Sequence, residues 1–308
     1  MTLKRGDIWV VDFGRGVGTE IGGKETNGVQ DSIRPAVIVS SDRYNDVLQV
    51  TVVPVMNYDE RYRELSINWG FKLTKKRVIE HPRNRVHRKL YYDYSFVDCG
   101  QLSTIFAIPP NFPGKNSLPA HIETELLWDY PCGTLREEFL LRLDNALQMV
   151  VGGDTIVGDL RDGSPVYGDV VEIRGGNHLM GHYLVISSTG IDALRESIKL
   201  SPPNPETLNH ITVIPISYKD SYDPDEALNQ VPGISLVHVQ WDNQIGRELW
   251  MANCTSINTF DRVTRSTKVV GHVTFDDMRW VAHRVRQYLD LPPLRLMPTG
   301  FPLGGCHA

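Results

Sequence analysis

A run of positive charge between residues 72 and 89 is the part of this sequence best suited to bind a polyanion. It carries eight lysines and arginines against one acid, Glu80, and Tyr91, Tyr92 and Tyr94 follow it. Such cations can track a phosphate backbone while the rings stack on bases, although a solvated face is the commoner role of a charge run. The candidate nucleic-acid-binding residues are Lys75, Lys76, Arg77, Arg83, Arg85 and Arg88.

Cysteine and histidine spacing predicts no metal site. The four cysteines, at positions 99, 132, 254 and 306, are too widely spaced for a Cys-x-x-Cys knuckle, and the histidines at 178, 182 and 210 lack ligand spacing. We expect the cysteines to be free thiols in a reducing compartment, with Cys99 and Cys254 in apolar surroundings.

Charge is unevenly divided along the 308 residues. Residues 1–150 hold 19 basic and 19 acidic side chains, net zero, whereas residues 151–308 hold 13 and 18, and the whole chain has a net charge of −5. A polyanion is therefore expected to meet the first half. The sequence has no apolar run of 18 residues and no signal-peptide apolar region, so we expect a cytoplasmic protein without a membrane span.

The elements that position these residues are predicted to be mainly β-strands. Residues 4–13 are rich in β-branched and aromatic types, residues 34–42 are entered through Pro35, and residues 50–56 form a third apolar run. A hydrophobic content of 41% supports a packed core, and the length of 308 residues predicts two domains.

Each of these segments has a counterpart in the second half. Gly168-Asp169 stands at the place of Gly6-Asp7, and each half has a cysteine followed five residues later by a threonine. The counterpart segments are 165–173 for the opening strand, 182–188 for 35–41, 212–217 for 51–56, and 254–260 for 99–105. The pattern indicates tandem duplication of one small β-rich domain.

Each copy is predicted to close with a helix. Thr134-Leu-Arg-Glu137 fits a capping box, and apolar residues spaced by three and four follow it as far as Val150. Thr274-Phe-Asp-Asp277 is predicted to open the second helix. The resulting prediction is a first domain at 1–151, a linker at 152–164, a second domain at 165–291 and an irregular tail at 292–308.

Four fragments in this order resemble the MazF/PemK toxin family. They are Arg5-Gly-Asp-Ile8, Gly18-Thr-Glu-Ile-Gly-Gly23, Arg34-Pro-Ala-Val-Ile-Val-Ser40 and Val52-Val-Pro-Val-Met56, and residues 99–105 are similar to the family's Cys-Asp-Gln-Leu-Arg-Thr-Ile segment. The resemblance covers most of residues 4–150 and, more faintly, 166–291. It implies a mainly β (β+α) fold of two tandem SH3-like β-barrels, each ending in an α-helix, arranged as a covalently fused pseudo-dimer.

Members of that family that cut RNA use neither a metal nor a cofactor: the ribose 2′-OH attacks the adjacent phosphate and leaves a 2′,3′-cyclic phosphate. The resemblance implies that Arg34 clamps the phosphate and that Glu20 orients Arg34 or takes a proton, the alternative being a salt bridge within the first domain. The family's threonine is replaced by Met56. In the second copy Ser217 keeps a hydroxyl, but Gly181 stands at the place of the arginine.

We therefore predict a toxin–antitoxin-type protein that binds single-stranded RNA, with an antitoxin protein as partner and RNA cleavage by 2′-OH attack as a further hypothesis. The alternative is a catalytically inactive binding or regulatory protein on the same fold that acts on a protein or DNA target, because a fold alone does not select a function. The incomplete site in each copy, with Met56 in one and Gly181 in the other, keeps this alternative open.

Overall fold

A computed structural model describes the conformation of the chain over several stretches. They are residues 3–13, 25–26, 29–30, 33–45, 49–57, 70–82, 95–106, 125–126, 130–151, 165–176, 178–187, 210–218, 233–261 and 265–293. The predicted linker 152–164 and most of the predicted tail lie outside them. Among the residues that are described, no helix is long and apolar enough to cross a membrane.

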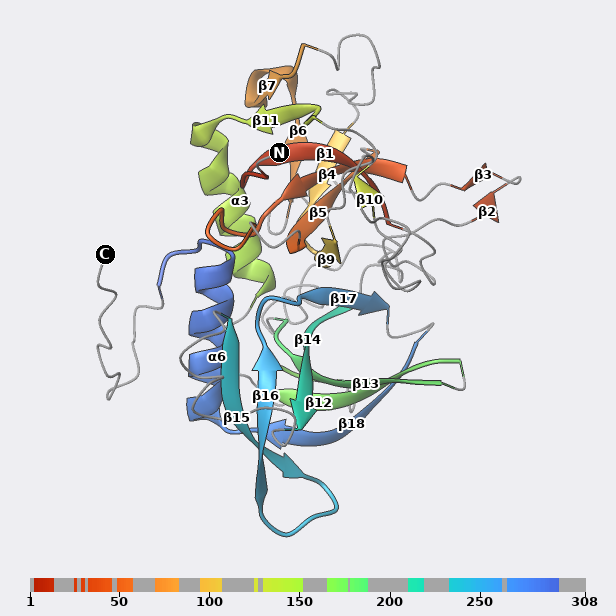
Figure 1. The fold of residues 1–308 in the computed structure, drawn as a ribbon, viewed down its shortest axis with the longest axis vertical. Helices are drawn as coiled ribbons and strands as arrows, with labels where there is room; N and C mark the ends of the chain where they lie inside the picture. The colour runs from red at the N-terminus through yellow and green to blue at the C-terminus, as the bar shows by residue number, and fades with distance from the viewer. Residues whose placement is uncertain are drawn as a thin grey trace, which may run out of the picture.

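The described chain is mainly β, as predicted. The strands of the first half are β1 (Asp7–Asp12), β2 (Glu25–Thr26), β3 (Val29–Gln30), β4 (Ile33–Ile38), β5 (Gln49–Asn57), β6 (Gly70–Leu73), β7 (Val78–Glu80), β8 (Ser95–Asp98), β9 (Ser103–Phe106), β10 (Glu125–Leu126) and β11 (Gly133–Leu135). Those of the second half are β12 (Asp169–Gly175), β13 (His178–Val185), β14 (His210–Tyr218), β15 (Ile234–Trp241), β16 (Arg247–Asn253), β17 (Asn258–Asp261) and β18 (Ser266–Val273). The helices are α3 (Glu137–Val150) and α6 (Phe275–Tyr288), and the short 3₁₀ helix η2 spans Lys75–Arg77. Figure 1 shows α3 and α6 following one another along the same side of the molecule.

The order in which the strands pair is the same in the two halves. In the first half β1 pairs with β4, β4 with β5, and β5 with both β8 and β9, while β6 pairs with β8 and β11 with β1. In the second half β12 pairs with β13, β13 with β14, and β14 with both β16 and β17, while β15 pairs with β16 and β18 with β12. All of these ladders are antiparallel. β9 meets β17 through Ser103 and Asn258, and this contact joins the ladders of the two halves into one continuous sheet.

The alternation of side chains along the strands creates one shared core and two smaller clusters. The shared core takes Ile8 and Val10 from β1, Leu147 from α3 and Val285 from α6, and so runs through both halves. The Trp9 cluster of the first half comprises Leu3, Trp9, Val11, Phe13, Ala36, Ile38, Val50, Val52 and Ile105. The Val171 cluster of the second half comprises Val171, Ile173, Val185, Ile211 and Val213, with Tyr183, Phe260 and Val269 packed against it.

The repeated Gly-Asp pair forms the same turn at the start of each half. Gly6 and Gly168 have φ angles of +86° and +93°, a region that favours glycine. The aspartate that follows accepts a hydrogen bond from the backbone N–H three residues before it, at 3.3 Å for Asp7 and 2.9 Å for Asp169. Burial raises the pKa of both carboxyl groups. This part of the repeat therefore has a structural role.

The predicted capping box of the first helix is wrong. α3 begins at Glu137 with Arg136 as its N-cap, and no side chain caps it. Thr134 instead belongs to β11, where it lies opposite Asp7 and donates its hydroxyl to Asp7 Oδ1 at 2.6 Å. The physical reason is that a β-branched threonine suits a strand, and the neighbouring strand β1 supplies the buried carboxylate of Asp7 as its partner.

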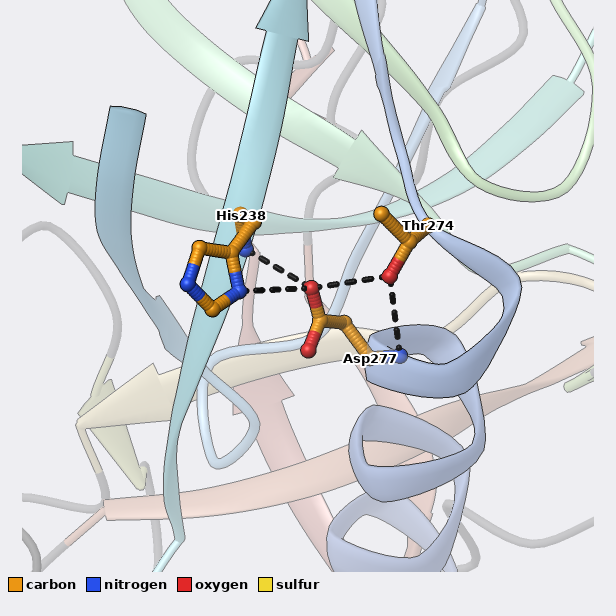
Figure 2. A network of polar contacts seen from close by, with 3 residues as sticks. All are labelled: His238, Thr274 and Asp277. Atoms are coloured by element: carbon orange, nitrogen blue, oxygen red, sulfur yellow. Dashed lines mark hydrogen bonds and ion pairs between the residues drawn. The ribbon is translucent and has the colours of Figure 1, made fainter. Parts of the chain in front are cut away.

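The predicted cap of the second helix is confirmed. Thr274 Oγ accepts a hydrogen bond from the backbone N–H of Asp277 at 3.3 Å, and its hydroxyl donates to Asp277 Oδ2 at 2.9 Å. Figure 2 shows that the same carboxylate oxygen also contacts His238 on β15, accepting from its backbone N–H at 2.9 Å and lying 3.1 Å from its Nδ1. The cap thus ties α6 to the sheet.

The repeated threonines exchange hydrogen bonds between the two halves. Thr104 Oγ1 accepts a bond from the backbone N–H of Ile257 at 2.7 Å. In the reciprocal contact Thr259 Oγ1 accepts from the backbone N–H of Leu102 at 2.9 Å. These two contacts, which flank the Ser103–Asn258 pair, are called the threonine joint below.

The end of α6 strengthens the contact between the halves. The hydroxyl of Thr51 on β5 lies 2.7 Å from that of Thr104 and donates to the Tyr288 hydroxyl at 3.1 Å. The backbone N–H of Ser41 donates to the carbonyl of Tyr288 at 2.7 Å. The last residue of the second-half helix is therefore held by strand β5 and by the segment that follows β4.

Replacing Thr104 or Thr259 by valine should lower the free energy of unfolding by about 1–3 kcal/mol, because each change leaves a backbone N–H of the other half without its acceptor. Urea denaturation measures this. Thr267→Val, on strand β18 and away from the contact between the halves, is the matched control and should change stability by less than about 0.5 kcal/mol. Equal stability of all three variants and the wild type would show that the threonine joint contributes nothing.

Candidate nucleic-acid interface

Arg34 lies near the start of β4 with its side chain half-buried. Strand alternation places it on the same face as Ala36 and Ile38, which belong to the Trp9 cluster. Its partner on β1 is Val11. Asp7 lies four residues farther along that strand, about 13 Å away by strand rise, and its carboxylate accepts from Thr134 and from the backbone N–H of Lys4.

Met56 occupies the position across from Arg34 when the β4–β5 register is continued by two residues. Its sulfur accepts a weak hydrogen bond from the side-chain amide of Gln101 at 3.9 Å, and the same amide donates to Asp98 Oδ2 at 3.3 Å. The thioether therefore contacts the turn that follows β8. At this position the first half places no hydroxyl opposite its arginine.

The second half shows the complementary arrangement. Continuing the β13–β14 register by one residue places the exposed Ser217 opposite Gly181. Gly181 has a φ of +146°, and a Cβ added to it would lie 3.6 Å from Cε2 of Tyr183. Ser217 thus stands where Met56 stands in the first half, and Gly181 where Arg34 stands. Neither half combines a cation and a hydroxyl at these two positions.

The basic segment begins with two exposed lysines and one packed arginine. Lys75 and Lys76 on η2 are exposed, whereas Arg77 is half-buried. The guanidinium of Arg77 donates to the carbonyl of Lys72 and lies 5.1 Å from the ring centroid of Phe139 on α3. Burial and the charge of a neighbouring arginine lower the pKa of Arg77. Arg77 therefore connects α3 to β6, the strand that precedes η2.

The structure describes some of the predicted site residues and not others. Glu20, Arg83, Arg85 and Arg88 lie outside the described residues, so their roles stay predictions. Within the described stretches, no group of three or more His, Cys, Asp or Glu side chains could hold a metal ion. The described cysteines at 99, 132 and 254 are buried free thiols, and burial raises the pKa of Cys254 to about 12.

Part of the first half matches a known protein family. Residues 4–91 match the model described as the PemK-like, MazF-like toxin of type II toxin-antitoxin system. This segment is similar to the PemK/MazF toxin family. A crystal structure of MazE-MazF from Deinococcus radiodurans is similar over 42% of this chain and 100% of its own, with 11% sequence identity and a TM-score of 0.29. No curated protein matches the chain.

The PemK/MazF match confirms the family resemblance for the first half. Residues 4–91 include Arg34, Met56 and η2, whereas Gly181 and Ser217 lie beyond the match. A second PemK/MazF-type domain therefore stays a prediction.

An aromatic cluster on the second half was not singled out from the sequence. Trp241 and Trp250 pack edge to face with ring centroids 5.0 Å apart, and both indole N–H groups donate to Glu248 Oε2, at 2.9 and 3.2 Å. His182 and Tyr218 pack against these rings. Glu248 and Trp250 are two residues apart on one strand, so strand alternation alone predicts that their side chains lie on the same face of the sheet. Both tryptophans pack on the shared core, which gives the cluster a structural role.

Arg77→Ala should lower the free energy of unfolding by about 1–3 kcal/mol, because it removes a hydrogen bond to a carbonyl and a cation–π contact that hold α3. The double variant Lys75→Ala/Lys76→Ala, which removes only exposed cations, should change stability by less than about 0.5 kcal/mol. Urea denaturation compares them. Equal destabilisation of the two variants would contradict the structural role of Arg77.

Proposed function

We propose that this chain is a PemK/MazF-type toxin–antitoxin protein that binds single-stranded RNA through its first half. The observation that carries the proposal is the family match over residues 4–91, a segment that holds Arg34 and the exposed Lys75 and Lys76. The distribution of charge supports it, because the first half is neutral overall and the second half is acidic.

RNA cleavage by attack of the ribose 2′-OH is a further step of the proposal. The attack needs a cation on the phosphate oxygens, which Arg34 can supply through its planar fork of donors. It also needs a donor or base nearby, and the thioether of Met56 supplies neither while it accepts from Gln101. This contact favours the second candidate function, a catalytically inactive binding protein on the same fold.

We also propose that the two halves form a covalently fused pseudo-dimer, with domains at 1–151 and 165–291. The identical pairing order of the strands and the reciprocal contacts of the threonine joint support this arrangement. Fusion keeps the two halves at a high effective concentration and allows each to diverge. The family description names a toxin–antitoxin system, which supports an antitoxin protein as a partner.

Binding is tested with a fluorescently labelled single-stranded RNA, whose anisotropy is measured over a range of salt concentrations. Lys75→Ala/Lys76→Ala should weaken binding to all sequences and lower the slope of log affinity against log salt by about 0.7 for each phosphate that the variant leaves unneutralised. Arg174→Ala/Lys268→Ala is the matched control, since it removes two exposed cations from the second half. Absence of binding by the wild-type protein at low salt would overturn the proposal, and an unchanged slope in the lysine variant would overturn the role of η2.

Cleavage is tested by Met56→Thr, which places a hydroxyl opposite Arg34. The rate of RNA cleavage should rise by about 100-fold, as expected for one added donor to a developing negative charge. EDTA should leave the rate unchanged and the products should carry a 5′-hydroxyl. Adding Arg34→Ala to this variant should remove the gain and leave most of the binding. If Met56→Thr binds RNA but gains no cleavage, the catalytically inactive candidate is the better description.

A further inference from the structure

The Val171 cluster of the second half and the Trp9 cluster of the first half differ at three equivalent positions, one of which is an arginine in the first half only. Strand register aligns equivalent positions of the two clusters. The differing pairs are Arg34 and Gly181, Ala36 and Tyr183, and Ile105 and Phe260. The second half therefore lacks the arginine of the first and carries two aromatic rings on the same face.

Arg265, which lies just before β18, places a positive charge next to Phe260 on this face. Its guanidinium lies 5.2 Å from the ring centroid of Phe260, and Nη1 donates to the sulfur of Met180 at 2.8 Å. The ring of Phe260 packs edge to face on Tyr183 with centroids 5.4 Å apart. Tyr183 in turn lies beside Gly181. Arg265, Phe260 and Tyr183 thus form a continuous row that reaches the position of the missing arginine.

This row carries two polar groups, the guanidinium of Arg265 and the phenol of Tyr183. Burial raises the pKa of Tyr183, and the positive charge of Arg265 acts in the opposite direction. Ser217, which is exposed and opposite Gly181, adds a hydroxyl at the same end of the sheet. A guanidinium with two hydroxyl groups offers the donors that phosphate oxygens accept.

We propose that Arg265, Tyr183 and Ser217 bind a phosphodiester group of single-stranded RNA in the second half, at the place that corresponds to Arg34 in the first. The inference rests on the proposed function. The fork of a guanidinium matches two phosphate oxygens, and its position over the Phe260 ring limits the freedom that binding would remove. The neighbouring ring of Tyr183 packs on the Val171 cluster, which holds its phenol in place beside Gly181.

The test compares variants in their affinity for a labelled single-stranded RNA across salt concentrations. Arg265→Ala should lower affinity by about 10-fold, as expected when one charge-assisted hydrogen bond is removed, and the salt slope by about 0.7. Arg265→Lys keeps the charge without the fork, so it should keep the slope and lower the affinity by a smaller factor. The matched control Arg174→Ala removes an exposed arginine from the neighbouring strand β12 and should leave both quantities nearly unchanged.

A second measurement uses the wild-type protein alone and does not depend on how a variant folds. Phenylglyoxal modifies accessible guanidinium groups, and mass spectrometry reports the modification of Arg265 with and without bound RNA. RNA should protect Arg265; equal modification in both samples would overturn the second site. If wild-type protein binds RNA while Arg265→Ala leaves the slope unchanged, only this inference fails. If the wild-type protein does not bind RNA, the proposed function fails with it.

Discussion

The threonine joint is the interaction on which the rest of the structure depends. Thr104 and Thr259 each accept a backbone N–H from the other half, and buried polar groups must be paired to avoid a penalty of about 1–3 kcal/mol each. The same hydroxyls contact Thr51 on β5 and Thr212 on β14. The joint therefore also fixes the two central strands, on which the equivalent positions Met56 and Ser217 lie.

Much of the strand plan was open to prediction because each half repeats the same apolar runs, and hydrophobic alternation is a local signal. The failure at Thr134 has a physical cause. A threonine three residues before a glutamate fits a capping box, yet this hydroxyl pairs with Asp7, which lies 127 residues away in the sequence. The Thr274 cap was predicted correctly because its partner, Asp277, is local. Local sequence patterns therefore predict where helices and strands lie. The exact first residue of a helix also depends on whether the expected capping side chain has a competing partner far away in the sequence.

Some features of the candidate site could likewise be predicted from the sequence, and others could not. The repeats were enough to align Arg34 with Gly181 and Met56 with Ser217, and strand register gives the same alignment. A charge run alone did not separate Arg77, which packs on Phe139, from the exposed lysines beside it. The row of Arg265, Phe260 and Tyr183 was not foreseen because its side chains come from segments that are brought together only by the folded sheet.

The central claim is that the halves associate through their own surfaces, as two subunits of a dimer would, and not merely through the peptide that links them. A specific protease site inserted within residues 152–164 tests this directly. After complete cleavage the native molar mass is measured by size-exclusion chromatography with light scattering. The account predicts that the two pieces remain together as one species near 34.8 kDa, the mass of the intact chain. Separation into two smaller species under native conditions would contradict it.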